Sequence, residues 1–195
     1  MASRSQRRGR RNDQGQLRLI GGDWRRRTLN FPAVDGVRPT PDRVRETLFN
    51  WLMPILPGSH CLDLFAGSGA LGLEALSRGA SSVTFVEQSP ALARALSQNL
   101  ATLNAQGATV VQQEALTWLH TPGDTRPRIV FMDPPFRVGL VEPVCGALAE
   151  SSLLPDNARV YVEHETDHDP RVPPEWHLAR RKQAGQVAYS LFEVA

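Results

Sequence analysis

From residue 60 onward, short apolar runs alternate with stretches of helical periodicity, and this alternation strongly constrains the fold. The runs are continuously apolar and rich in β-branched residues, which is typical of strands that are buried on both faces. Such strands, separated by helices, form a parallel sheet with helices on both sides. The expected strands are Cys61–Phe65, Val83–Val86, Val110–Val111, Ile129–Met132 and Val160–Val162, and the expected helices cover 70–78, 89–104, 114–120 and 139–150.

The C-terminal segment departs from this alternation. Trp176–Gln183 and Val187–Val194 flank Ala184-Gly185-Gln186 in the manner of an antiparallel hairpin. We therefore expect a hairpin that closes one edge of the sheet.

The N-terminal segment precedes the alternating pattern and is divided into two parts. Residues 1–16 are polar and rich in Arg and Gln, and are predicted to form a disordered basic tail. Residues 17–37 are predicted to form a basic β-hairpin extension, which leaves residues 38–195 as the main α/β domain. Thr40-Pro41-Asp42 is typical of a helix start with Thr40 as the N-cap.

Charge is distributed unevenly along the chain, although the formal net charge is only +2. Residues 1–45 contain twelve Arg and four Asp, for a charge of +8, whereas residues 46–195 carry −6. Of the 22 basic residues, 21 are Arg, whose planar guanidinium binds phosphate through two parallel hydrogen bonds. This asymmetry favours a polyanionic partner, but a solvated tail explains the first few arginines equally well.

Several classes of protein are excluded by composition and length. The 195 residues fit a single domain, and no window approaches the 18 consecutive apolar residues of a membrane span. The basic N-terminal run is followed by polar residues and does not resemble a signal peptide. Cys61 and Cys145 lie in apolar surroundings, and a chain of this length needs no disulfide. We expect a soluble cytoplasmic protein without a resident metal.

A glycine-rich turn follows the first expected strand. Gly67, Gly69 and Gly72 match the G-x-G-x-x-G dinucleotide fingerprint, which alone is a weak signal. Asp63 precedes the turn inside the strand, where its carboxylate would repel a pyrophosphate but attract the ammonium group of a methionine moiety. Glu87, after the second strand, is placed to accept hydrogen bonds from ribose hydroxyls. The combination favours S-adenosylmethionine over NAD as the cofactor.

The fourth expected strand ends in Asp133-Pro134-Pro135-Phe136. Consecutive prolines remove two N–H donors, so the Asp133 carboxylate and the backbone carbonyls act only as acceptors. An exocyclic amine of a nucleobase is a poor nucleophile because its lone pair is delocalised into the ring. Accepting both N–H hydrogens, at Asp133 and the Pro134 carbonyl, would direct that lone pair toward a methyl sulfonium, while Phe136 stacks on the base.

With these motifs, the chain resembles the RsmD family of 16S ribosomal RNA guanine-N2 methyltransferases over residues 17–194. The matching segments are LRLIGGDWRRRTL, VRPTPDRVRETLFNWL, CLDLFAGSGALGLEALSRGA, VFMDPPF and AGQVAYSL. The resemblance implies a Rossmann-like class I methyltransferase fold with a seven-stranded, mostly parallel sheet. It further implies transfer of a methyl group from S-adenosylmethionine to N2 of one guanine in 16S rRNA, the guanine(966) site. The expected substrate is the small ribosomal subunit or its assembly intermediate, and the enzyme is expected to be a monomer.

The resemblance also implies three sets of site residues. The catalytic set is Asp133, Pro134, Pro135 and Phe136; the cofactor-binding set is Thr40, Asp63, Phe65, Gly67, Ser68, Gly69, Glu87, Gln88, Glu114 and Ala115; and the RNA-binding set is Arg18, Arg25, Arg26, Arg27, Arg38 and Arg43. For Thr40, helix capping is an equally good explanation, and for Arg43 the alternative is an ion pair with Glu46.

Two positions depart from the family pattern. Arg26 stands where the family usually has Gly, and Gln113-Glu114-Ala115 replaces the usual Asn-Asp-Ala. Glu114 retains a carboxylate that could accept a hydrogen bond from the adenine amine, but it is one methylene longer than Asp. Its assignment is therefore weaker than that of Glu87.

Three other functions are weighed against this hypothesis. The string His164-Glu165-Thr166-Asp167-His168 spells the zinc protease motif H-E-x-x-H, but it follows a strand and runs into prolines, so a helix is not expected there. A DNA adenine-N6 or cytosine-N4 methyltransferase would use a similar Asp-Pro-Pro-Phe motif, but the chain has no segment long enough for a target-recognition insertion. A non-catalytic RNA-binding assembly factor would not need that motif intact.

Overall fold

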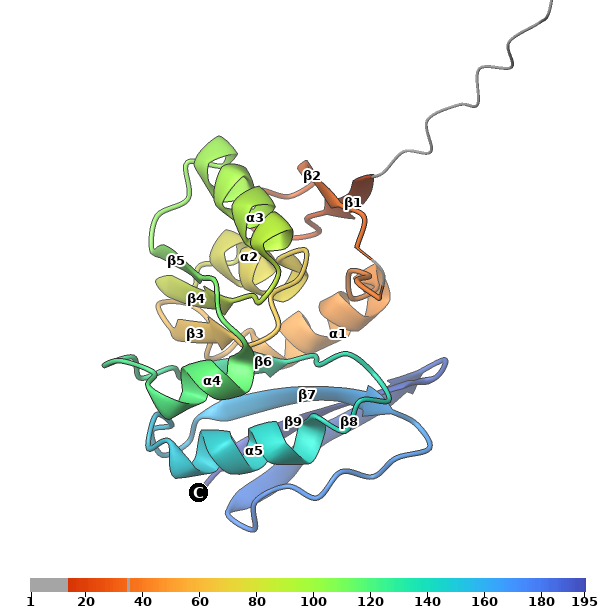
Figure 1. The fold of residues 1–195 in the computed structure, drawn as a ribbon, viewed down its shortest axis with the longest axis vertical. Coiled ribbons are helices and arrows are strands. Elements are labelled where there is room, and N and C mark those ends of the chain that lie inside the picture. The colour runs from red at the N-terminus through yellow and green to blue at the C-terminus, as the bar shows by residue number, and fades with distance from the viewer. Residues whose placement is uncertain (1–13, 35) are drawn as a thin grey trace, which may run out of the picture.

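A computed structural model describes residues 14–34 and 36–195, and its centre is a seven-stranded sheet of order β5-β4-β3-β6-β7-β9-β8 (Figure 1). Strands β5, β4, β3, β6 and β7 are parallel, and β9 runs antiparallel to both of its neighbours, β7 and β8. The strands are β3 (His60–Asp63), β4 (Ser82–Val86), β5 (Ala108–Val111), β6 (Ile129–Met132), β7 (Arg159–Glu165), β8 (Trp176–Ala184) and β9 (Val187–Val194). The predicted α/β fold, its parallel strands and its C-terminal hairpin are confirmed.

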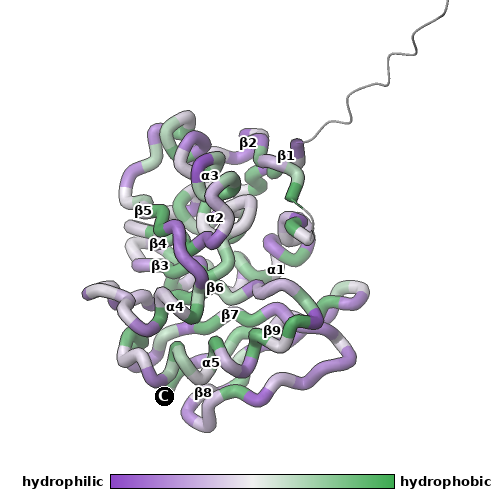
Figure 2. The backbone as a smooth tube through the Cα atoms, viewed as in Figure 1, coloured by the Kyte–Doolittle hydropathy of each residue, from purple (hydrophilic) through white to green (hydrophobic). Residues whose placement is uncertain are grey.

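Helices cover both faces of the sheet (Figure 1). The helices are α1 (Asp42–Leu52), α2 (Ala70–Ser77), α3 (Pro90–Thr102), α4 (Ala115–His120) and α5 (Val141–Glu150). One buried apolar cluster joins the sheet to α1, α2 and α3, and a second joins it to α4 and α5. Alternate strand residues enter opposite clusters, as Phe131 and Met132 of β6 do, because successive side chains of a strand point to opposite faces. Figure 2 shows hydrophobic segments along the central strands.

The N-terminal extension is an antiparallel hairpin of β1 (Gln14–Arg18) and β2 (Thr28–Pro32). Its apolar side chains, among them Leu17 and Phe31, are buried in the same cluster as α1, α2 and α3. β1 begins at Gln14, inside the range 1–16 that we predicted as tail, because Gln14, Gly15 and Gln16 pair with β2. The rest of the predicted tail, residues 1–13, lies outside the described residues.

The connection between β1 and β2 docks on the C-terminal end of α2. The amide of Asp23 donates to the carbonyl of Ser77 at 2.8 Å, and the Ser77 hydroxyl donates to the carbonyl of Gly21 at 2.6 Å. Gly22 has φ +71°, and a Cβ there would lie 1.7 Å from the Ser77 carbonyl oxygen. Only glycine permits this approach of two backbones.

Helix α1 begins one residue later than a Thr40 cap would require. Its N-cap is Pro41, and no side chain caps the helix. The predicted capping role of Thr40 is therefore wrong, because its hydroxyl turns toward Asp133. Among the ion pairs of the described residues, Asp42 pairs with Arg45 at 2.6 Å, and the alternative considered for Arg43, an ion pair with Glu46, is not formed.

None of the helices in residues 14–34 and 36–195 combines the length and the apolar character that a membrane crossing requires.

Candidate active site

Three acidic residues meet where parallel strands end. Asp63 is the last residue of β3, Glu87 directly follows β4, and Asp133 directly follows β6. From β3 the chain proceeds to β4 and β5 on one side of the sheet, whereas β6 and β7 lie on the other side. This reversal between β3 and β6 is the topological switch point at which open α/β sheets bind ligands. The structure therefore brings together the acidic residues that the sequence placed at separate strand ends.

Asp63 is buried beneath the glycine turn. Only 2% of its surface is exposed, and its Oδ2 accepts a hydrogen bond from the Gly72 amide at 3.0 Å. Burial raises the pKa of Asp63 to about 7, and the negative charges of Asp133 and Glu87 add to that effect, while the Gly72 hydrogen bond opposes it. A buried carboxyl group among other carboxylates is stabilised in its charged form when a cation binds beside it.

Asp63→Asn is expected to stabilise the folded protein above pH 7. A folded-state pKa of about 7, raised from 3.8, means that ionisation of Asp63 costs stability as pH rises through that window and costs it fully above pH 7. Asparagine avoids this cost and can still accept from Gly72, so the free energy of unfolding should rise by about 2–4 kcal/mol at pH 8 and change little at pH 4.

Urea denaturation at both pH values measures this effect, with Asp156→Asn, at an exposed position, as the control. Equal stability of wild type and Asp63→Asn at pH 8 would contradict the burial of an ionised carboxylate.

Glu87 joins the glycine turn to the start of α3 through its two carboxylate oxygens. Oε2 accepts from the Gly67 amide at 2.7 Å and Oε1 accepts from the Ser89 amide at 2.7 Å. Gly67 and Gly69 have φ values of 52° and 82°, in the left-handed region that favours glycine. Each carboxylate oxygen can accept a second hydrogen bond, so Glu87 can hold the turn and still bind hydroxyl groups of a ligand.

Asp133 stands at the start of the Asp-Pro-Pro-Phe segment. It is partly buried, and Thr40 Oγ1 donates to its Oδ2 at 3.4 Å. Burial raises the pKa of Asp133 to about 7, against the lowering effect of the hydrogen bond from Thr40. Pro134 is buried, whereas Phe136, two residues later in the same segment, is 37% exposed. An acceptor and an accessible aromatic ring are thus adjacent.

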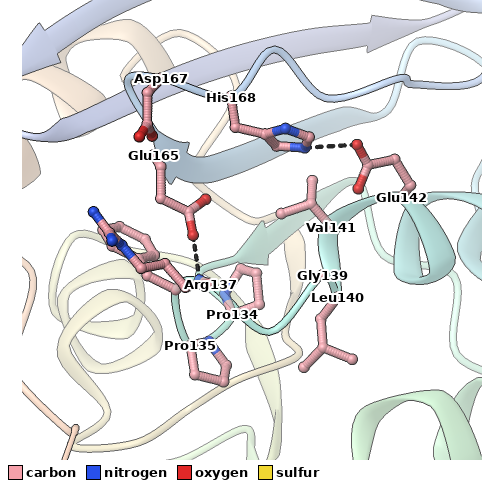
Figure 3. Close-up of a pocket in the computed structure, with 11 residues that line it drawn as sticks. Pro134, Pro135, Arg137, Gly139, Leu140, Val141, Glu142, Glu165, Asp167 and His168 are labelled. Atoms are coloured by element: carbon pink, nitrogen blue, oxygen red, sulfur yellow. Dashed lines mark hydrogen bonds and ion pairs between the residues drawn. The ribbon is translucent and has the colours of Figure 1, made fainter.

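A cavity of about 360 Å³ opens beside this segment (Figure 3). It lies between the loop that leads from β6 to α5 and the end of β7. Figure 3 shows Glu165 directed toward the backbone of Arg137, whose amide donates to it, and His168 Nε2 2.7 Å from Glu142 Oε1. The lining residues are Pro134, Pro135, Phe136, Arg137, Gly139, Leu140, Val141, Glu142, Glu165, Asp167 and His168.

The predicted cofactor residues after β5 are arranged differently from the others. Glu114 is the N-cap of α4, with its carboxylate accepting from the amides of Leu116 at 3.1 Å and Thr117 at 2.8 Å. Burial opposes ionisation of Glu114, but these hydrogen bonds outweigh it and lower its pKa. Both oxygens therefore face its own helix, and Ala115 behind it is buried.

The remaining predicted cofactor residues flank the turn. Ser68 is buried and Phe65 partly buried within the glycine segment, while Gln88 is exposed next to Glu87.

The predicted RNA-binding arginines all have exposed positions. Arg25, Arg26 and Arg27 lie in the connection between β1 and β2, and Arg18 ends β1 beside them, where Nη2 contacts Asp42 Oδ2 at 2.9 Å. Arg38 precedes α1 and Arg43 lies within it. The hairpin thus brings Arg18 together with Arg25, Arg26 and Arg27, whereas Arg38 and Arg43 lie on either side of Thr40 in the sequence.

Sequence reasoning missed a buried ion pair between α1 and α2. Arg45 is 1% exposed and Glu74 is 0% exposed, and they approach to 3.2 Å. Arg45 Nε also donates to the carbonyl of Thr40 at 3.0 Å, so this pair supports the residue that contacts Asp133. Arg45 lies in an amphipathic helix and Glu74 in a helix that is buried on all sides, and no local pattern marks them as partners.

Glu163 in β7 was also missed, although the sequence contained a signal for it. It directly follows the apolar run Val160–Val162, as Asp133 follows β6. The string that resembles a zinc motif begins one residue later, where His164 and Glu165 end the strand. Within the described residues, no group of three or more His, Cys, Asp or Glu side chains is arranged to hold a metal ion.

Comparison with known proteins identifies the family. The family model described as Conserved hypothetical protein 95, which represents the RsmD family, matches residues 17–193. The chain belongs to this family. The Ribosomal RNA small subunit methyltransferase D of Escherichia coli (strain K12) is 53% identical over 180 residues, covering 92% of this chain and 90% of that protein.

Solved structures agree with the fold. The yhhF protein of Escherichia coli has a TM-score of 0.86 at 53% identity, covering 92% of this chain and 98% of that chain. The 16S rRNA N2 G1207 methyltransferase (RsmC) of Thermus thermophilus, solved with AdoMet and guanosine, has a TM-score of 0.67 at 20% identity, covering 93% of this chain and 50% of that one. The predicted Rossmann-like methyltransferase fold and membership of the RsmD family are confirmed.

Proposed function

We propose that this RsmD-family protein transfers a methyl group from S-adenosylmethionine to N2 of a guanine, the guanine(966) site, in 16S rRNA of the small ribosomal subunit or its assembly intermediate. The observation that carries the proposal is the placement of an acceptor-only segment, Asp133-Pro134, at the same sheet edge as the buried carboxyl groups of Asp63 and Glu87. The proposal is also supported by the 53% identity to a ribosomal RNA small subunit methyltransferase.

The acidic edge fits the charge of the proposed cofactor. S-adenosylmethionine supplies an electrophilic methyl group on a positively charged sulfur and also carries an ammonium group. Asp63, whose pKa is raised to about 7 by burial beside other carboxylates, would regain its ionised form next to such a cation. Glu87 would accept hydrogen bonds from ribose hydroxyls through its free lone pairs.

The Asp-Pro-Pro-Phe segment fits an exocyclic amine. The Asp133 carboxylate and the Pro134 carbonyl would each accept one N–H of the amine, which withdraws the nitrogen lone pair from the ring and orients it for in-line attack. The accessible Phe136 ring would stack on the base. These residues orient the nucleophile directly, so the reaction needs no covalent intermediate on the protein.

A label-transfer assay tests this function. The protein is incubated with methyl-labelled S-adenosylmethionine and, separately, with small subunits from cells that lack the corresponding gene, with naked 16S rRNA, and with DNA. We expect label in the subunits, in N2-methylguanine, and its loss when guanine(966) is replaced by adenine. Label found only in DNA would contradict the proposal and favour a DNA amino-methyltransferase; no transfer to any substrate would favour a non-catalytic assembly factor.

The basic hairpin is proposed to bind the RNA backbone, and Arg26 offers a sharp test. Its φ of 69° is in the left-handed region, which costs about 1–2 kcal/mol for a residue other than glycine. Arg26→Gly removes this strain, so we expect unchanged or slightly raised stability, together with weaker RNA binding and a salt dependence shallower by about one counterion.

Arg26→Ala separates the two contributions, because it removes the guanidinium but keeps the strained backbone. It should bind RNA as weakly as Arg26→Gly does and be the less stable of the two. Filter binding at several salt concentrations and urea denaturation provide the measurements. RNA affinity equal to wild type in both variants would show that Arg26 does not contact RNA.

A further inference from the structure

Glu163 lies beside Asp133 on the neighbouring strand. In the parallel pairing of β6 with β7, Met132 is opposite Val162, so the next residues along the two strands are Asp133 and Glu163. Glu163 is 3% exposed, although Glu side chains are rarely buried without a partner. Its position therefore needs an explanation that the fold alone does not supply.

The contacts of Glu163 connect it to the reacting end of the site. Tyr161 Oη donates to Glu163 Oε1 at 2.8 Å. Thr40 Oγ1 donates to Asp133 Oδ2 at 3.4 Å, and the strand register places Asp133 next to Glu163. Two carboxyl groups can hydrogen-bond to each other only when one of them carries a proton, and adjacent buried carboxylates strongly oppose double ionisation.

We propose that Glu163 is a positioning residue that shares one proton with Asp133, and that this carboxyl pair takes up the proton released by the amine. The inference rests on the proposed function, since it requires an amine as methyl acceptor. The nitrogen–carbon bond forms as the carbon–sulfur bond breaks, and that electron pair stays on sulfur. The nitrogen then loses one proton to the pair, so the positive charge of the sulfonium and the negative charge of the pair are both cancelled.

The groups around the pair favour retention of one proton. Burial raises the pKa of Glu163 well above its usual range, and the adjacent negative charge of Asp133 raises it further. Tyr161 also has a raised pKa, through burial and the charges of Glu163, Asp133 and Tyr189, and so remains a hydrogen-bond donor. Asp63, the last residue of β3, is a further acidic group near the pair, and its negative charge and that of Asp133 repel each other. The charges acting on the pair are thus negative.

The decisive variant is Glu163→Gln, which retains size and removes the proton-binding site. We expect kcat on small subunits to fall about 10- to 100-fold, with KM and the dissociation constant for S-adenosylmethionine changed less than about threefold. Glu163→Asp should recover part of kcat. Tyr161→Phe keeps the carboxyl group but removes its donor, and should lie between wild type and Glu163→Gln. Glu175→Gln, at an exposed position before β8, is the control.

Infrared titration without cofactor or RNA provides a second readout. A pH of 8.5 lies above the pKa of Asp63 and the pKa of Asp133, both of which are raised to about 7. At this pH the wild type should still show the C=O band of a protonated carboxyl group, and Glu163→Gln should lack it. Persistence of the band in Glu163→Gln, or a wild-type kcat and pH profile for that variant, would overturn the inference. If the wild type itself does not methylate guanine, the proposed function fails instead, and the infrared result still decides whether the pair shares a proton.

Discussion

Asp133→Ala is expected to lower the rate of methyl transfer by about 10²- to 10⁴-fold while leaving the affinity for S-adenosylmethionine within a few-fold of wild type. Alanine removes the acceptor that would orient the amine but leaves Asp63 and Glu87, at the ends of neighbouring strands, in place. Single-turnover transfer to unmethylated small subunits and calorimetric cofactor binding measure the two effects. Asp156→Ala, which removes an exposed carboxylate, is the matched control.

A stability measurement distinguishes this loss from unfolding. Burial raises the pKa of Asp133 to about 7, so its ionisation costs stability in the folded protein above that pH. Asp133→Ala should therefore be at least as stable as wild type at pH 8, even though it is inactive. An active Asp133→Ala enzyme would refute the assignment of Asp133, and an inactive variant that is also unfolded at pH 8 would contradict its electrostatic basis.

Glu74→Gln is expected to lower the free energy of unfolding by about 3–5 kcal/mol, because it removes the fully buried one of the two carboxylate partners of Arg45 and leaves only the half-exposed Asp42. Glu74 also accepts from the backbone amides of Ile20 at 3.0 Å and Gly21 at 2.8 Å, and from Arg78 Nε at 2.7 Å. One carboxylate thus joins α2, α1 and the basic hairpin. Urea denaturation measures the loss, and Glu150→Gln, at the exposed end of α5, is the control.

The double variant Arg45→Met, Glu74→Met refines this test. Replacing both members of a buried ion pair by apolar residues often costs little, so the double variant should be more stable than the sum of the two single changes predicts. The recovery should be incomplete, because the amides of Ile20 and Gly21 still lose their acceptor. A loss below about 1 kcal/mol in Glu74→Gln would show that Arg45 finds other partners and that Glu74 is not required.

Predictions from the sequence succeeded where local pattern and structure depend on the same few residues. The apolar run at Ile129–Met132 became β6 with the predicted bounds, since four consecutive buried residues between two helical segments have few alternatives in a parallel sheet. The Asp-Pro-Pro-Phe segment follows directly and therefore lies at the sheet edge. Because carboxyl ends of parallel strands meet at one edge, the strand order also brings Asp63, Glu87 and Asp133 together.

The local sequence did not decide the outcome where a side chain could choose between a local and a distant partner. Thr40 had the sequence of an N-cap, yet its hydroxyl donates to Asp133, 93 residues away. Both oxygens of Glu114 cap α4, a local role that the sequence did not indicate, and its contact with a cofactor stays a prediction because each oxygen can accept a second hydrogen bond. A hydroxyl or carboxylate group can hydrogen-bond to the nearby backbone or to a distant side chain with a similar gain in free energy. Only the packed structure decides between these two partners.

The sequence by itself determined the strands and helices, the edge at which the acidic and proline-rich motifs meet, and the family. Each of these depends on periodicity or on contiguous motifs. Only the tertiary structure decided the pairing of Arg45 with Glu74, 29 residues apart, the contact of Glu74 with the hairpin, 53 residues away, and the placement of Glu163 beside Asp133. The physical reason is that a buried polar group needs a hydrogen-bonding partner, and the packed chain can supply one from any part of the sequence. No local sequence pattern shows which distant residue that partner is.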